Sequence, residues 1–126
     1  MKQLIAFIIV LFIVVFSGIW EITYLNESGK YLMSDIRDIY QISMRGEYEA
    51  AENDGGILKE NWKELKKTWA LFINDGEIAS IEYNMVNFIS YIDTKNEEEI
   101  SKEYNLLMAK IKNVVAFQEL KVENVF

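Results

Sequence analysis

Aromatic and acidic side chains lie close together in the sequence between residues 62 and 82. The members of this group are Trp62, Trp69, Phe72, Asp75, Glu77 and Glu82. Carboxylates held near one another can bind a cation or act as general acid and base. The sequence therefore offers a candidate binding surface, which consists of Trp62, Trp69, Asp75, Glu77 and Glu82.

A structural interpretation of the same residues competes with the binding one. Trp62 and Trp69 are one heptad apart, which is typical of two side chains buried on one face of a helix. Asp75 and Glu77 fall in the expected first turn of a helix, where negative charge interacts favourably with the helix dipole. The binding hypothesis instead requires the carboxylates to converge within about 4 to 6 Å, with raised or coupled pKa values.

Basic residues gather around the two tryptophans, and acidic residues begin a later segment. The basic residues are Lys59, Lys63, Lys66 and Lys67, and the acidic ones are Glu97, Glu98, Glu99 and Glu103. Basic residues interleaved with aromatic ones can bind nucleic acid or lipid headgroups. We expect instead a solvated basic face that attracts the acidic run on another helix, and we expect the acidic run itself to be a solvated helix start.

The composition removes several classes of chemistry. The 126 residues include no cysteine, histidine or proline, so thiolate chemistry and the commonest neutral acid/base and metal ligand are missing. No serine lies in a motif that would activate it, and no phosphate-binding loop is found. The net charge of −7 disfavours nucleic acid as a partner. We therefore expect no enzymatic activity, no cofactor, no metal and no nucleic-acid binding.

The N-terminal segment is long enough to cross a membrane. Residues 3–20 carry no charge, and residues 4–16 are apolar without a break. A helix of about 20 residues spans the hydrocarbon core of a bilayer. Lys2 precedes the segment and Glu21 follows it, so the positive-inside rule predicts a cytoplasmic N-terminus. We expect residues 1–24 to form a membrane anchor or uncleaved signal, and residues 25–126 to form an extracytoplasmic helical bundle.

A cleaved secretory signal is the alternative interpretation of this segment. A charged start followed by an apolar run of about 13 residues also matches the first two regions of a signal peptide. Val15 and Ser17 before Gly18 match the small-residue cleavage rule poorly, however, and no lipobox cysteine is present. Trp20 and Tyr24 also fall where an interfacial aromatic belt would lie. We therefore prefer a retained single span over a secreted helical protein.

Beyond the apolar segment, apolar residues recur every three or four positions, which is the pattern of amphipathic helices. The four stripes are Leu25, Gly29, Leu32, Ile36 and Ile39; Tyr48, Ala51, Gly55, Leu58, Trp62, Leu65, Trp69 and Phe72; Ile78, Ile81, Met85, Phe88 and Ile92; and Ile100, Tyr104, Leu107, Ile111 and Val114. We expect an all-α fold, in which an N-terminal transmembrane helix of about 40 residues continues into an antiparallel bundle of about four helices. The weakly alternating end, residues 117–126, predicts an extended tail.

Local signals predict where these helices begin and break. Asn74 with Glu77, and Thr94 with Glu97, have the spacing of an N-cap with a capping box, and predict the starts of two helices. Residues 54–56, an Asp followed by two Gly, are weak helix formers and predict a kink or a short break.

The stretch from Trp62 to Asp93, together with the apolar segment and the ending ELKVENVF, resembles a known family. This is the domain of unknown function 4363 family, small membrane-anchored helical proteins of spore-forming Gram-positive bacteria. Its most specific motif is carried here by Trp62, Trp69, Asp75, Glu77, Ile78, Ile81 and Glu82. Where the family commonly has a His after the Asp, this sequence has Gly76, so either that His is dispensable or this member is inactive. The resemblance implies a single-span, helical, envelope-associated protein and no particular reaction.

Two functions from different classes fit these observations. The first is a non-enzymatic interaction or structural module, which contacts an envelope or sporulation protein or a second copy of itself through the long first helix. It predicts an exposed apolar patch larger than a few hundred Å², and Tyr31, Tyr40, Tyr83 and Tyr91 could contribute to such a surface. The second is ligand or cation binding at the acidic and aromatic cluster.

Overall fold

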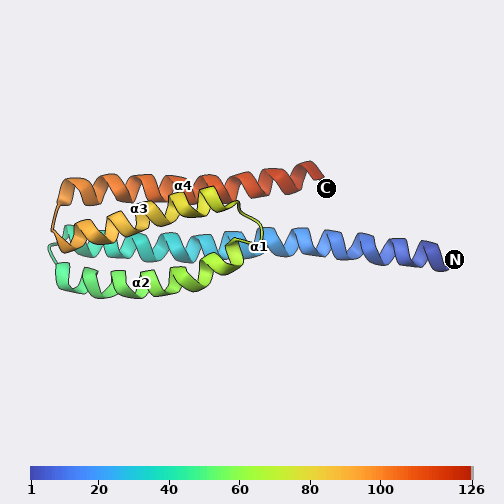
Figure 1. The fold of residues 1–126 in the computed structure, drawn as a ribbon, viewed down its shortest axis with the longest axis horizontal. Coiled ribbons are helices and arrows are strands. Elements are labelled where there is room, and N and C mark those ends of the chain that lie inside the picture. The colour runs from blue at the N-terminus through green and yellow to red at the C-terminus, as the bar shows by residue number, and fades with distance from the viewer. Residues whose placement is uncertain (126) are drawn as a thin grey trace.

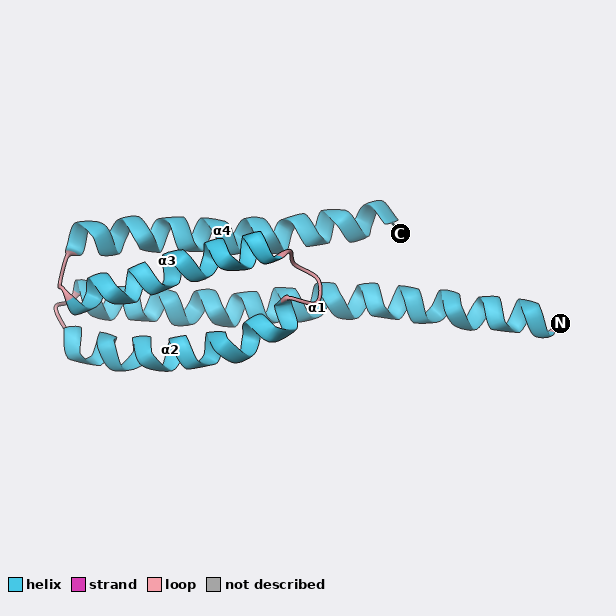
Figure 2. Cartoon of the chain, in the orientation of Figure 1, coloured by secondary structure: helices cyan, strands magenta, loops and turns pink. Residues whose placement is uncertain are grey.

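The computed structural model describes residues 1–125, apart from the side chains of residues 121, 122 and 125. Four helices follow one another along the chain. They are α1 (Lys2–Met44), α2 (Tyr48–Trp69), α3 (Asp75–Asp93) and α4 (Glu97–Val125). Short loops at 45–47, 70–74 and 94–96 join them (Figure 2), and the described part of the chain has no strand. The expected all-α fold of four helices is confirmed.

The helices form an antiparallel bundle in which each helix packs against two neighbours. The main packing pairs are α1 with α2, α2 with α3, α3 with α4, and α4 with α1. Consecutive helices run in opposite directions, and the N-terminal part of α1 projects beyond the other helices (Figure 1). The loop between α2 and α3 and the end of α4 lie at the end of the bundle from which this extension projects.

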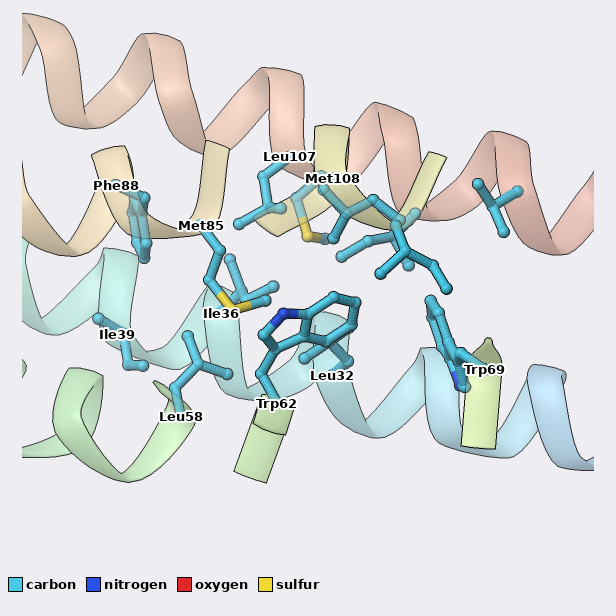
Figure 3. Packing of buried hydrophobic residues seen from close by; sticks show 14 of the residues in the cluster. Leu32, Ile36, Ile39, Leu58, Trp62, Trp69, Met85, Phe88, Leu107 and Met108 are labelled. Carbon is cyan, nitrogen blue, oxygen red and sulfur yellow. The ribbon is translucent and has the colours of Figure 1, made fainter. Parts of the chain in front are cut away.

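The predicted stripes form the core of the bundle. Every member of the first and third stripes is buried. In the second and fourth stripes the half-buried members are Tyr48, Leu65, Phe72 and Tyr104, and the others are buried. Side chains from all four helices meet along the axis, as the labelled residues of Figure 3 show. Burial of this apolar surface is the main free-energy gain that holds the four helices together.

Helix α1 is unbroken over 43 residues, which confirms the predicted single rod. Helix α2 is also continuous, so of the predicted kink or short break at residues 54–56 the break is wrong. The reason lies in packing, because Gly55 is buried where α2 approaches Ile89 of α3, and a Cβ built on it would lie 3.4 Å from the Ile89 Cγ2. Tertiary packing commonly outweighs a propensity cost of about 1 kcal/mol per glycine.

The predicted extended tail is wrong as well, because α4 continues as a helix to Val125. Phe126 lies outside the described residues. The fourth stripe extends by one more helical turn, from the buried Val114 to the buried Gln118. A polar residue at the stripe position concealed this continuation in the sequence.

One of the two predicted N-caps is confirmed. The Asn74 side chain accepts a hydrogen bond from the Glu77 backbone N–H at 2.9 Å and opens α3. The second cap is Asn96 rather than Thr94, since the Asn96 side chain accepts from the Glu99 backbone N–H at 3.3 Å. Thr94 instead follows α3 as its C-cap, and its hydroxyl donates to the Tyr91 carbonyl.

A prediction follows from the close approach of α1 and α4 at Gly29. A Cβ on Gly29 would lie 3.0 Å from the Val115 Cγ2, whereas one on the exposed Gly56 would meet nothing within 4 Å. We expect Gly29→Leu to lower the free energy of unfolding by about 1 to 3 kcal/mol through overpacking. We expect Gly56→Ala to raise it by about 0.5 to 1 kcal/mol through helix propensity.

Thermal unfolding of the detergent-solubilised chain, followed by circular dichroism, measures both effects. Adding Val115→Ala to Gly29→Leu should recover part of the loss, because it removes the side chain that clashes. A Gly29→Leu protein as stable as the parent would contradict the close approach of the two helices.

Candidate functional site

Trp62, Lys66 and Glu82 form a polar link between α2 and α3. The Trp62 indole Nε1 donates to Glu82 Oε1 at 3.0 Å, and the Lys66 Nζ donates to the same oxygen at 2.7 Å. Trp62 itself is buried, while the Lys66 and Glu82 side chains remain 38% and 39% exposed. The hydrogen bond from Lys66 lowers the pKa of Glu82, and the Trp62 indole lowers it further against the opposing effect of burial. Glu82 is therefore held as an ionised acceptor.

Trp69 lies in the core beside Trp62. Their rings are 5.8 Å apart between centroids at an interplanar angle of 84°, an edge-to-face arrangement. The Trp69 Nε1 donates to the Ser28 hydroxyl of α1 at 2.9 Å, and that hydroxyl donates to the Tyr24 carbonyl at 2.7 Å. Figure 3 shows Trp69 at the end of the core toward the N-terminal extension. Both indole N–H groups are thus satisfied inside the bundle.

The structure brings Trp62, Trp69 and Glu82 together but leaves the other two predicted carboxylates elsewhere. Asp75 is exposed and Glu77 half-buried, and both belong to the first turn of α3. Glu82 follows Asp75 by about two helical turns, or roughly 10 Å along the axis. Within the described residues, no group of three or more acidic side chains is placed to hold a metal ion. A role for these five residues as a ligand-binding surface stays a prediction.

The link through Glu82 makes a testable contribution to stability. Because the folded-state pKa of Glu82 lies below its unfolded value, its charge adds stability that is fully present above the ordinary glutamate pKa of 4.5 and is lost as the pH falls through the lowered pKa. We expect Glu82→Gln to cost up to about 1 kcal/mol at pH 7, a modest value because the pair is partly exposed.

Urea unfolding of Glu82→Gln and the parent chain at several pH values measures this difference. The two stabilities should converge on acidification, once the parent Glu82 is protonated. Glu60→Gln is the matched control, since Glu60 forms an exposed pair with Lys63 on α2 alone. A difference for Glu82→Gln that persists unchanged at the acidic end would contradict the charge-based link.

The lysines on the basic face of α2 form ion pairs with other residues than the acidic run of α4 that was expected. Lys63 bonds to Glu60 at 3.4 Å and Lys67 to Glu64 at 3.3 Å, so both pairs lie within α2. Lys66 reaches α3 instead of the acidic run of α4. Exposed pairs of this kind contribute little individually. Lys63, Lys66 and Lys67 each pair with a glutamate, and no described ion pair joins the basic residues to α4.

Glu103 was expected in a solvated helix start, and that expectation is wrong. It is only 6% exposed and accepts a hydrogen bond at 2.6 Å from the Nδ2 of Asn84, which is 3% exposed. The Lys110 Nζ donates to the Asn84 Oδ1. This buried network between α3 and α4 was missed in the sequence. Its signal was present, since Asn84 and Glu103 both fall on the buried faces of their helices.

An acidic cleft between α1 and α2 was also not predicted. Asp35 and Asp38 of α1 face Asp54 of α2 across a hollow of about 280 Å³, whose other lining residues are Ile39, Ile57, Leu58 and Asn61. Burial raises the pKa of Asp35, and the charges of Asp38 and Asp54 raise it further. Like charges placed this close oppose folding slightly. The cleft is therefore an electronegative hollow between α1 and α2.

The end of the bundle next to the N-terminal extension is aromatic and apolar. The Phe72 ring lies 6.1 Å from the ring of Trp20 and 6.1 Å from the ring of Tyr24, measured between centroids. Trp20 is 56% exposed, and Leu71 beside Phe72 is 75% exposed. On the N-terminal side of Trp20, the apolar side chains of the extension are exposed along most of its length. Helix α1 is long and apolar enough to cross a membrane by length and composition.

Fold and site together define an all-α protein, a four-helix bundle with an exposed apolar extension on its first helix. The chain belongs to the family described as Domain of unknown function (DUF4363), whose family model matches residues 19–125. The match confirms the resemblance seen in the tryptophan motif. It begins at Ile19, so it covers the bundle and leaves out the apolar residues before it. Neither the curated proteins nor the solved structures give a significant match.

Proposed function

We propose that this protein is a single-span membrane protein of the cell envelope, whose helical bundle acts outside the cytoplasm as a non-enzymatic interaction or structural module. The observation that supports this best is the continuity of α1. Its large apolar side chains are exposed up to Trp20, yet the same helix enters the bundle core at Leu25 without a break. The first part of α1 thus exposes an apolar surface that lipid can cover, and the rest of the same helix packs into the bundle.

The exposed surface of the extension needs an apolar environment. Contiguous exposed apolar surface of this extent is rare on soluble monomers and favours association with lipid or protein. The charge-free stretch 3–20 is about 27 Å long as a helix, close to the thickness of a hydrocarbon core. Within it, Ser17 donates its hydroxyl to the Ile13 carbonyl, so its polar group is satisfied inside the helix. A single membrane span accounts for all three features.

The charges at the two ends of the span support the orientation. Lys2 lies on one side of the apolar stretch, and Glu21 and Glu27 lie on the other. Positive residues are favoured on the cytoplasmic side, so the bundle is placed on the opposite side. The net charge of −7 favours this placement away from anionic cytoplasmic lipid.

The interaction role is supported by exposed side chains on the bundle itself. Of the four tyrosines considered for a contact surface, Tyr31 and Tyr83 are strongly exposed. Tyr40 instead stacks on Tyr104 at 4.0 Å between ring centroids and bonds to Ser101, which gives it a structural role. Ile57 is exposed beside the acidic cleft. The ligand or cation alternative has less support, because Glu82 is already engaged by Trp62 and Lys66.

Single cysteines test the topology cleanly, because the chain has no cysteine of its own. Ala50→Cys, at the exposed start of α2, should react with a membrane-impermeant maleimide in intact cells. Gln3→Cys should react only after the cells are permeabilised. The reverse pattern would contradict the orientation.

The same cells test retention of the anchor and the interaction role. Mass spectrometry of the tagged chain, purified from membranes with its crosslinked partners, should find the intact N-terminus and an envelope protein or a second copy. A chain that begins near Gly18 would establish cleavage instead. A chain recovered from membranes without any crosslinked protein would contradict the interaction role.

A further inference from the structure

We propose that the loop between α2 and α3, residues 70–74, is a second membrane contact, in which Leu71 enters the interfacial layer of the bilayer and holds the bundle end-on against the lipid. This inference rests on the membrane anchoring proposed above. It adds a lipid-binding element from a part of the chain that is distant in sequence from the span.

The position of the loop follows from its aromatic contacts. The Phe72 ring lies 6.1 Å from the ring of Trp20, the last residue of the charge-free stretch. Leu71 directly precedes Phe72 in the chain, and the Cα atoms of the two residues are about 3.8 Å apart. The polar layer on each side of a bilayer is about 5 to 8 Å thick. If Trp20 lies in that layer, the Phe72 ring lies in it or at its edge, and Leu71 is covalently joined to Phe72.

The composition of the loop fits lipid rather than water. Residues 70–74 read Ala, Leu, Phe, Ile and Asn. Leu71 is 75% exposed, whereas Phe72 is half-buried and Ile73 is buried in the core. The loops at the other end of the bundle are polar, with Arg, Gly and Glu at 45–47 and Thr, Lys and Asn at 94–96. Loops normally carry polar residues at the surface, and the strongly exposed Leu71 departs from this. The apolar loop occurs only at the end that faces the proposed membrane.

The end of α4 extends past the loop between α2 and α3, alongside the extension (Figure 1). Val115 lies opposite Gly29 of α1, and α4 runs from there toward the end with the extension (Figure 1). Five residues further, Leu120 is about 7.5 Å closer to the membrane, near the height of Tyr24. Phe117 and Leu120 are both exposed. Leu120 adds exposed apolar surface at this end of the bundle, and Phe117 lies about 4.5 Å further from the membrane along α4.

Lipid is preferred over a second copy of the chain as the partner of this surface. The unbroken helix from Leu4 through Trp20 to Leu25 leaves no flexible linker that could lift the bundle away from the bilayer. Lipid is consequently present at this end whenever the span is inserted. The contact also directs the opposite, polar end of the bundle outward, about 36 Å from Trp20 along α1.

Site-specific fluorescence in vesicles tests the contact with the full-length chain. Leu71→Cys is labelled with an environment-sensitive NBD dye and reconstituted into phosphatidylcholine vesicles, with and without lipid that carries a nitroxide quencher. Tyr31→Cys is the matched control, because Tyr31 is equally exposed at 75% and lies eleven residues beyond Trp20, about 16 Å further from the membrane. We expect blue-shifted emission at position 71 that the nitroxide lipid largely removes, and water-like emission at position 31 that it leaves intact.

Each other outcome overturns the proposal in a recognisable way. Water-like emission at position 71 in vesicles that carry the protein through a flotation gradient would refute the loop contact and leave the anchor standing. Blue-shifted emission at position 71 that the nitroxide lipid does not quench would show that a second copy of the chain, and not lipid, covers the loop. Quenching at both positions would mean that the bundle lies on its side. Protein that fails to float with the vesicles would refute the anchor and the loop contact together.

Discussion

Trp69→Ala is expected to lower the free energy of unfolding of the bundle by about 3 to 5 kcal/mol, the usual cost of deleting a buried tryptophan. The Trp69 side chain is 0% exposed and packs edge-to-face on Trp62. Its removal also leaves the Ser28 hydroxyl without the indole donor that ties α2 to α1. The loss therefore combines a cavity, an aromatic contact and a hydrogen bond between helices.

Thermal or urea unfolding of the detergent-solubilised chain measures this loss, with circular dichroism as the readout. Trp69→Phe should retain much of the stability, since it keeps an aromatic ring and loses mainly the hydrogen bond, worth about 1 kcal/mol. Trp20→Ala is the matched control, because Trp20 lies outside the buried core and is largely exposed. Equal losses for Trp69→Ala and Trp20→Ala would contradict the central position of Trp69.

The helices could be predicted from the sequence because their apolar faces repeat with helical spacing over several turns. In α3, for example, Ile78, Met85 and Phe88 are all buried as their spacing requires. Where the prediction failed, a local signal conflicted with tertiary packing. The glycines at 55 and 56 indicated a break, yet Gly55 allows α2 to approach Ile89 closely and the helix continues.

The polar contacts could be predicted only in part, since they depend on how neighbouring helices align. Trp62 and Trp69 were expected in the core from their heptad spacing, and both are buried. Nothing in the sequence shows that Glu82 of α3 meets Trp62 and Lys66 of α2, because the spacing within each helix says nothing about the axial shift between them. Glu103 was misplaced for a different reason, since its neighbours Glu97 to Glu99 made it look like part of a solvated run.

Asn84→Leu is expected to destabilise the bundle by about 1.5 to 3 kcal/mol, the usual contribution of a hydrogen bond to a charged group. Asn84 is 3% exposed, and its Nδ2 donates to the Glu103 carboxylate at 2.6 Å. Leucine cannot donate, so the carboxylate would remain buried without this hydrogen bond. Lys110 would lose its acceptor on Asn84 as well.

The double variant Asn84→Leu with Glu103→Leu separates the network from simple packing. An apolar replacement of a whole buried polar group is often neutral or stabilising, so the double variant should regain most of the stability that Asn84→Leu loses. Urea unfolding of the single and double variants gives the coupling free energy between Asn84 and Glu103. Glu98→Gln serves as the control, because Glu98 is an exposed acidic residue on the same helix as Glu103. A double variant as unstable as Asn84→Leu would show that the loss comes from packing. Recovery would instead show that the loss comes from leaving the Glu103 carboxylate buried without its hydrogen bond.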